Sequence, residues 1–330
     1  MKIAICRLRQ GVHYERPLTT ILDSFYECLR AFIRANPQHD YSYFKFSFAN
    51  FDTARKPTNL KALELADVVI IPSEAEFTYW VPGKLHSLSV NASNQQVRRI
   101  GKAIAGKRVI LLRSDRADSI ELYRTRTFQN RSIDYRIVDE DDFPFGIHGM
   151  KYHFIKDRFS DLHAKTRIID FAYWGSDKSK LPDGKRSGDM RHAVLRELQE
   201  SELATCFWGR VRGIDPYQKW EKKFENLAPW LWMVKSTLCF NWIDPKAITA
   251  RYAESLACGV MPFVWENYDA SNKVVWDDWQ RIYDSSEIGE KLSEKSFQTR
   301  FRTIRREYER RLPSISDYKK MFSNKLDALL

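Results

Sequence analysis

Cysteine is scarce in this chain, and the few cysteines are widely dispersed. The five are Cys6, Cys28, Cys206, Cys239 and Cys258, and no two of them form a CxxC pair. An odd, scattered set of this kind argues against a scaffold held by disulfides. We therefore expect reduced cysteines buried in apolar surroundings, as in a cytoplasmic protein.

Long apolar runs, internal repeats and low-complexity segments are also absent. The longest apolar stretch is far too short to span a membrane. The segment Met1–Cys6 is typical of a first strand and is too short for a secretory signal. The seven histidines show no metal-ligand spacing, so we expect no structural metal.

Segments with strand and helix periodicity alternate along the chain, which favours parallel sheets with helices on both faces, an α/β fold. The 330 residues, 43% of them hydrophobic, are enough for two domains. In the first half we expect strands at 2–7, 41–48, 67–71, 107–112 and 134–138, and helices at 19–36, 60–65 and 95–105. In the second half we expect strands at 167–174, 205–208, 237–242 and 260–265, and helices at 189–203, 217–232, 248–257, 297–312 and 316–329. A polar, glycine-containing zone at 141–161 is expected to be a linker.

Positive charge is in excess, with a formal net charge of +11. A balance of this kind implies a polyanionic partner, with nucleic acid the first candidate and an anionic membrane surface the second. Aromatic residues make up 14% of the chain. They fit an aromatic-rich core, and they also fit surfaces on which bases stack.

The most informative stretch runs from Ile248 to Trp265, where a predicted helix ends at Gly259 and leads directly into a short apolar strand. Arg251 and Glu254 stand three positions apart and so share a helix face. They fit an exposed ion pair, and they equally fit a polar face directed at a ligand. In the second case Arg251 would hold a phosphate by paired hydrogen bonds and Glu254 would accept hydrogen bonds from ribose hydroxyls.

The run Arg251-Tyr-Ala-Glu254-Ser-Leu-Ala, the following strand and then Glu266-Asn-Tyr-Asp269 resemble the donor-sugar segment of phage DNA glycosyltransferases of GT-B fold. The resemblance is greatest to the β-glucosyltransferases, and 257–265 is also similar to the α-glucosyltransferases. It implies two Rossmann-like domains that face a central cleft, with a C-terminal helix that crosses back to the first domain. We expect a DNA-binding domain at 1–160, completed by the helix 314–330, and a donor-binding domain at 161–313.

A second segment of the same half is a candidate seat for a diphosphate. A glycine turn after a strand, basic residues and a helix N-terminus together favour an anion. The resemblance assigns Gly175, Ser176, Arg186 and Arg191 to the diphosphate, Arg191 with a slip of one residue. An insertion at 179–184 leaves open which basic residue reaches the phosphates. Gly209 corresponds to the glycine of the family's next strand, and Arg251 and Glu254 complete the UDP-sugar site.

Asp115 is the candidate catalytic base. It follows a predicted strand at the carboxyl edge of the first sheet, where ligands bind in open α/β folds. An inverting transfer needs a carboxylate to take the proton of the attacking hydroxyl, and the resemblance places the family's base here. A strand-end aspartate that caps a turn is the other interpretation, and Asp118 and Glu121 are rival candidates.

A basic strip follows Asp115 directly, with tyrosine and phenylalanine interleaved. Phosphate contacts from such a loop position DNA without reading its sequence, and a target base would be flipped out to reach the cleft. The arginines assigned to DNA are Arg116, Arg124, Arg126 and Arg131. A second basic set lies in the helix 297–312, where Glu307 and Glu309 favour a self-paired, solvated helix.

The sequence thus predicts a monomeric, cytoplasmic enzyme that transfers a sugar from a UDP-sugar to a hydroxymethylated pyrimidine, 5-hydroxymethylcytosine first, in phage duplex DNA. Two alternatives stay open: a GT-B transferase with a glycan or lipid-linked acceptor, and a non-catalytic nucleic-acid-binding protein. The pattern leaves undecided whether the sugar is glucose or another such as a pentose. It also leaves undecided inversion against retention, and whether Mg²⁺ or Mn²⁺ assists the diphosphate.

Overall fold

The structure is a computed structural model of the chain that describes residues 1–8, 22–46, 60–71, 103–113, 134–139, 142–159, 166–176, 188–210, 224–240 and 248–330. The chain divides into two compact units. Unit 1 comprises Met1–Phe143 together with Ser316–Leu330, and unit 2 comprises Pro144–Ile315. The C-terminal helix therefore returns to the first half of the chain, as the sequence predicted.

Unit 1 is built on a parallel sheet with the strand order β2-β1-β3-β4-β5. The strands are β1 (Lys2–Leu8), β2 (Asp40–Phe46), β3 (Val68–Ile71), β4 (Arg108–Arg113) and β5 (Asp134–Asp139). The helices with described bounds in this unit are α1 (Leu22–Ala35), α2 (Leu60–Leu65) and α12 (Ile315–Asp327). Each of these elements was predicted from the sequence, with ends that differ by a few residues. The predicted helix at 95–105 lies mostly outside the described residues.

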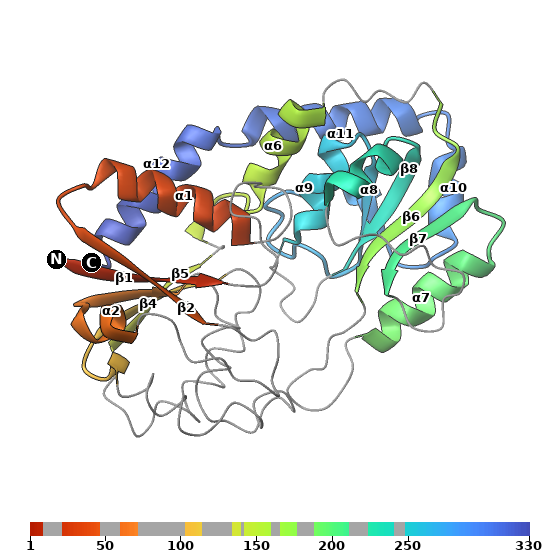
Figure 1. Cartoon of the computed structure of the whole chain (residues 1–330). Helices are drawn as coiled ribbons and strands as arrows, with labels where there is room; N and C mark the ends of the chain where they lie inside the picture. The colour runs from red at the N-terminus through yellow and green to blue at the C-terminus, as the bar shows by residue number, and fades with distance from the viewer. Residues whose placement is uncertain are drawn as a thin grey trace. The chain divides into compact units, whose positions relative to one another are not determined.

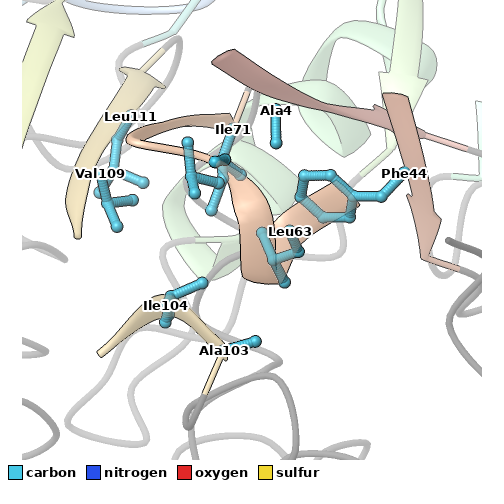
Figure 2. Close-up of a cluster of buried hydrophobic side chains, with 10 residues drawn as sticks. Ala4, Phe44, Leu63, Ile71, Ala103, Ile104, Val109 and Leu111 are labelled. Atoms are coloured by element: carbon cyan, nitrogen blue, oxygen red, sulfur yellow. The ribbon is translucent and has the colours of Figure 1, made fainter. Parts of the chain in front are cut away.

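The two faces of this sheet are covered separately. On one face, side chains of β1 to β4, among them Ala4, Phe44, Ile71 and Leu111, point toward Leu63 of α2 (Figure 2). Helices α1 and α12 of the same unit lie side by side (Figure 1), with Phe25 and Phe322 in ring contact at 6.2 Å between centroids. The C-terminal helix is therefore part of the core of unit 1.

Unit 2 repeats the same architecture with the strand order β10-β9-β8-β6-β7, again parallel throughout. The strands are β6 (Ile169–Ser176), β7 (Thr205–Arg210), β8 (Val234–Cys239), β9 (Met261–Trp265) and β10 (Arg281–Ile282). The helices are α6 (Gly149–Phe159), α7 (Gly188–Glu200), α8 (Phe224–Leu231), α9 (Ala250–Ala257), α10 (Glu287–Ser293), α11 (Phe297–Arg311) and the 3-10 helix η3 (Asp278–Gln280). The short strand β10 was not predicted.

Both sheets have the same strand order. In each, the second strand of the unit pairs with one edge of the first strand, and the third, fourth and fifth strands follow in turn from its other edge. In unit 2 the order reverses between β6 and β8. Ligands of doubly wound folds bind beyond the carboxyl ends of the strands at such a reversal. The end of β6, at Trp174, Gly175 and Ser176, is therefore the place in unit 2 where a ligand is expected.

The prediction of a linker at 141–161 is wrong, because most of this zone is helical. Helix α6 packs against α9 and belongs to unit 2, so the two units divide after Phe143 and not after residue 160. Phe145, Ile147, Met150 and Ile155 are each at most 6% exposed. The zone looks polar in sequence, but its apolar residues are buried by elements much later in the chain, Phe145 by Trp276 and Tyr308 and the helix α6 by α9.

Two expectations from composition can be compared with the structure. The four cysteines whose side chains the structure describes are free; Cys28, Cys239 and Cys258 are buried and Cys206 is half-buried. Burial raises the pKa of the Cys28 and Cys239 thiols to about 12, which keeps them protonated. Across the part of the chain that the structure describes, no helix is long and apolar enough to cross a membrane.

Candidate functional site

The carboxyl end of β6 has an unusual backbone conformation that brings Arg251 against it. Gly175 has φ +135°, which side-chain-bearing residues rarely adopt. Arg251 of α9 donates a hydrogen bond from Nη2 to the carbonyl of Trp174. A β-carbon on residue 175 would lie 2.6 Å from that same nitrogen. Glycine at this position is therefore what allows the guanidinium to reach the strand end.

The Arg251 guanidinium also lies over an aromatic ring. Its Cζ is 4.1 Å from the ring centroid of Tyr173, a distance typical of a cation–π contact. Burial raises the pKa of the Tyr173 hydroxyl, but the charges of Arg251 and Arg191 outweigh burial and bring the pKa below its usual value. Arg251 Nε meets no hydrogen-bond acceptor among the described residues. The atom is itself buried.

A second guanidinium approaches the same strand ends from α7. Arg191 is 3% exposed, and its Cζ lies 5.3 Å from the ring centroid of Phe240, the residue that follows β8. Two arginines from different helices thus meet near the ends of β6 and β8. Positive charge gathered at the reversal of a parallel sheet favours an anionic ligand.

Glu254 lies one turn after Arg251 on α9 and is 8% exposed. Its Oε1 accepts a hydrogen bond from Lys151 Nζ at 2.9 Å, and its Oε2 accepts one from Trp174 Nε1 at 3.1 Å. Burial raises the pKa of this carboxyl, but the charge and hydrogen bond of Lys151 and the hydrogen bond of Trp174 outweigh burial and hold the pKa below its usual value. Glu254 is therefore an ionised acceptor beside Arg251.

Helix α9, which carries Arg251 and Glu254, is fixed at both ends. At its start the Thr249 amide donates to the Tyr268 hydroxyl at 2.7 Å. At its end Arg167 donates to the carbonyls of Cys258 and Val234, which joins the helix to the first residue of β8. Gly259 then has φ +71°, and β9 begins two residues later. The helix-to-strand unit predicted from the sequence is confirmed.

The sequence-predicted donor residues converge to the extent that the structure describes them. Gly175, Arg191, Arg251 and Glu254 surround the end of β6, as described above. Gly209 of β7 lies opposite Gly175 in the ladder, and Ser176 is the last residue of β6. The remaining predicted residues lie outside the described part of the chain: Asp115, Arg116, Arg124, Arg126, Arg131 and Arg186. Strand β4, which Asp115 was expected to follow, ends at Arg113.

Sequence reasoning missed Lys151, Tyr173 and Trp174 as parts of this site. The aromatic pair was assigned only to the strand that precedes the glycine turn. Lys151 lies in the zone taken as a linker. One signal in the sequence could have identified it. Lys151 stands beside Met150 and four residues before Ile155, and a lysine buried among apolar residues needs a charged or hydrogen-bonding partner.

Chemically, the site offers two guanidinium groups and one carboxylate close together. Guanidinium groups donate to phosphate oxygens, and an ionised carboxylate accepts from hydroxyls. The combination fits a ligand with both phosphate and hydroxyl groups. Within the described residues no group of three or more His, Cys, Asp or Glu side chains is placed to hold a metal ion.

Comparison with known proteins identifies the fold. No protein-family profile and no curated protein sequence matches the chain. Among solved structures, the DNA-modifying enzyme β-glucosyltransferase, studied with and without uridine diphosphoglucose, covers 100% of this chain and 99% of its own at 14% identity and TM-score 0.59. An α-glucosyltransferase bound to UDP and a 13-mer DNA with an HMU base covers 99% of this chain and 98% of its own, at 12% identity and TM-score 0.53.

A third structure, T4 phage BGT with UDP and Mn²⁺, covers 100% of this chain and 99% of its own at 14% identity and TM-score 0.53. At such low identity these similarities establish the fold alone. The chain has the two-domain, Rossmann-like GT-B fold, which confirms the fold predicted from the sequence.

Proposed function

We propose that this chain is a DNA glycosyltransferase that moves a sugar from a UDP-sugar to a hydroxymethylated pyrimidine, 5-hydroxymethylcytosine first, in phage duplex DNA. One observation carries the proposal. Arg251 and Glu254, on one face of α9, are both hydrogen-bonded to Trp174 at the carboxyl end of β6, and Arg251 lies beside Gly175. This arrangement belongs to a fold whose solved relatives include glucosyltransferases bound to UDP and to DNA.

The donor half of the proposal assigns a role to each described side chain. Arg251 binds the diphosphate through its guanidinium, and Arg191 contributes a second positive charge. Backbone N–H groups at Gly175 and Ser176 and the start of α7 favour the same anion. Glu254 accepts hydrogen bonds from the ribose hydroxyls, and Arg186 is assigned to the diphosphate from its sequence position.

The acceptor half rests on residues outside the described part of the chain. We assign Asp115 as the base. The hydroxymethyl oxygen of the target attacks the anomeric carbon of the sugar, its proton passes to the Asp115 carboxylate, and the bond to the diphosphate oxygen breaks to release UDP. The configuration at the anomeric carbon is inverted. Arg116, Arg124, Arg126 and Arg131 contact DNA phosphates around a flipped base.

Two observations support a role for a divalent ion at the diphosphate. One of the similar structures holds UDP together with Mn²⁺, and a divalent cation neutralises charge that develops on a leaving diphosphate. In this chain Arg251 and Arg191 supply positive charge at the same place.

The proposed enzyme works as a monomer in the host cytoplasm.

The decisive experiment measures sugar transfer with three acceptors. The protein is incubated with radiolabelled UDP-glucose, and separately with other UDP-sugars, in the presence of hydroxymethylated duplex DNA, unmodified duplex DNA or a lipid-linked sugar. We expect label on the hydroxymethylated duplex alone. Label on the lipid-linked sugar would favour a glycan transferase, and DNA binding without any UDP binding would favour a non-catalytic protein.

A further inference from the structure

The most informative contact that the function above leaves unused is the one between Lys151 and Glu254. Lys151 lies on α6, 103 residues before Glu254 in the chain, and its ammonium group is 2.9 Å from Glu254 Oε1. The side chain of Lys151 is 4% exposed and that of Glu254 is 11% exposed. Helix α6 packs against α9, so the contact joins two elements of unit 2.

A pair this deeply buried constrains both partners. Neither an ammonium nor a carboxylate is stable away from water without a partner of opposite charge and good hydrogen bonds. Trp174 Nε1 satisfies the second carboxylate oxygen at 3.1 Å. Among the described residues, the other titratable groups near Glu254 are Arg251 on α9, Cys258 directly after α9 and Cys239 on β8. Of the groups that contact Glu254 directly in the described structure, only Lys151 carries charge.

The two hydrogen bonds fix the direction of the carboxylate as well as its charge. An ionised carboxylate has about four acceptor positions, and Lys151 and Trp174 occupy one on each oxygen. The remaining lone pairs then point in directions set by α6 and by the end of β6. A ligand hydroxyl meets acceptors that are already oriented, so little conformational entropy is lost on binding.

We propose that Lys151 is a positioning residue that keeps Glu254 ionised and oriented toward the ribose hydroxyls of the donor nucleotide. It thereby sets the preference of the site for a ribonucleotide over one without those hydroxyls. This inference rests on the proposed function, because it takes Glu254 as the ribose ligand. Lys151 does not touch the sugar or the diphosphate; it acts through the carboxylate.

The test compares UDP with 2′,3′-dideoxy-UDP by calorimetry at pH 6 to 8.5. A hydrogen bond to a charged group is worth roughly ten- to a hundredfold in affinity, so the wild type should prefer UDP by about that factor. In Lys151→Met the buried carboxylate loses its counter-ion and its pKa rises. The preference should then fall to within about threefold at pH 6 and recover as the pH rises through the new pKa of Glu254.

Matched variants separate positioning from folding. Lys156→Met removes an exposed lysine of the same helix that pairs with Glu309, and it should leave the preference and its pH profile unchanged. Lys151→Arg keeps the charge and should retain most of the preference. In turnover with UDP-glucose, Lys151→Met should raise KM with little change in kcat, since ground and transition states lose the same contact.

If Lys151→Met fails to fold, the same substitution is tested in the Glu254→Gln variant. Without the carboxylate charge the lysine has nothing to position. The preference of Lys151→Met/Glu254→Gln for UDP should therefore match that of Glu254→Gln within about twofold. The preference of Glu254→Gln alone should fall well below that of the wild type. A further loss in the double variant would overturn the inference, as would a wild-type preference in folded Lys151→Met at every pH. Absence of UDP binding to the wild type would instead overturn the proposed function itself.

Discussion

Arg251 occupies the space that a side chain at Gly175 would need. A β-carbon on residue 175 would stand 2.6 Å from Arg251 Nη2, and the backbone there has φ +135°. Arg251 cannot move aside freely, because it is hydrogen-bonded to the Trp174 carbonyl and lies over Tyr173. The strand end and the guanidinium therefore constrain each other, and a change in either one should alter the proposed donor site.

Gly175→Ala should displace Arg251 and weaken UDP binding. Loss of a hydrogen bond from a charged donor corresponds to roughly ten- to a hundredfold in affinity. Titration calorimetry with UDP checks this. Gly289→Ala is the matched control, since a β-carbon there would meet nothing closer than Leu203 at 3.7 Å. Equal UDP affinity in both variants would mean that Arg251 does not bind the diphosphate.

Arg251→Lys should lower UDP affinity about tenfold or more while leaving uridine affinity nearly unchanged. Lysine retains the charge but lacks the planar fork that binds phosphate at two points and stacks on Tyr173. Parallel titrations with UDP and uridine separate the phosphate contribution from the rest of the nucleoside. A matching loss for uridine would point to a general collapse of the site rather than a phosphate contact.

The sequence predicts the helix α9 and the strand β9 well because the signals for both are local. The helical spacing of Tyr252, Ala253 and Leu256 and the break at Gly259 lie within one short segment, and the structure confirms both the helix and the strand after it. The resemblance to known donor segments assigned Arg251 and Gly175 to one site, and the structure places them in contact.

Long-range burial explains what the sequence did not predict. Lys151 is buried only because α6 packs on α9, and nothing near Lys151 in the chain specifies Glu254 as its partner. Gly146 and Gly149 made the zone look like a connection. The two-residue strand β10 is set by pairing with β9 and has no periodicity of its own to detect.

The C-terminal helix should be essential to the stability of unit 1. Phe322 is fully buried and contacts Phe25 of α1. Phe322→Ala should cost about 3–5 kcal/mol of unfolding free energy from lost burial and the cavity left behind. Hydrogen exchange of the β1 and β3 amides reports this unit specifically. Lys320→Ala, at an exposed position of the same helix, should change protection by less than about 0.5 kcal/mol.

Duplex DNA should bind with a salt dependence that reflects contacts from the basic strip. Each lost phosphate contact lowers the slope of log K against log salt by roughly 0.9. Arg124→Ala/Arg126→Ala should therefore reduce the slope by about 1.8, with little effect of DNA sequence on affinity. Fluorescence anisotropy over a range of salt concentrations measures both quantities. An unchanged slope would move the DNA site to another surface, with the arginines of α11 the next to be tested.

Asp115→Asn should abolish most sugar transfer while UDP and DNA still bind. The residue follows β4, which ends at Arg113 in a parallel sheet, and the carboxyl edge of such a sheet is where catalytic groups collect. Proton abstraction by a positioned carboxylate contributes on the order of 10²–10⁴ in rate. Asparagine retains the size of the side chain but accepts no proton, so the single-turnover rate should fall by that factor.

The matched comparison is Asp118→Asn, which should be far milder because Asp118 lies further beyond the strand end. The assay follows radiolabelled sugar from its UDP donor onto hydroxymethylated duplex DNA in a single turnover. Near-normal turnover in Asp115→Asn would remove Asp115 from the mechanism. It would also favour retention of configuration at the anomeric carbon, because a retaining transfer does not require a protein carboxylate to deprotonate the acceptor.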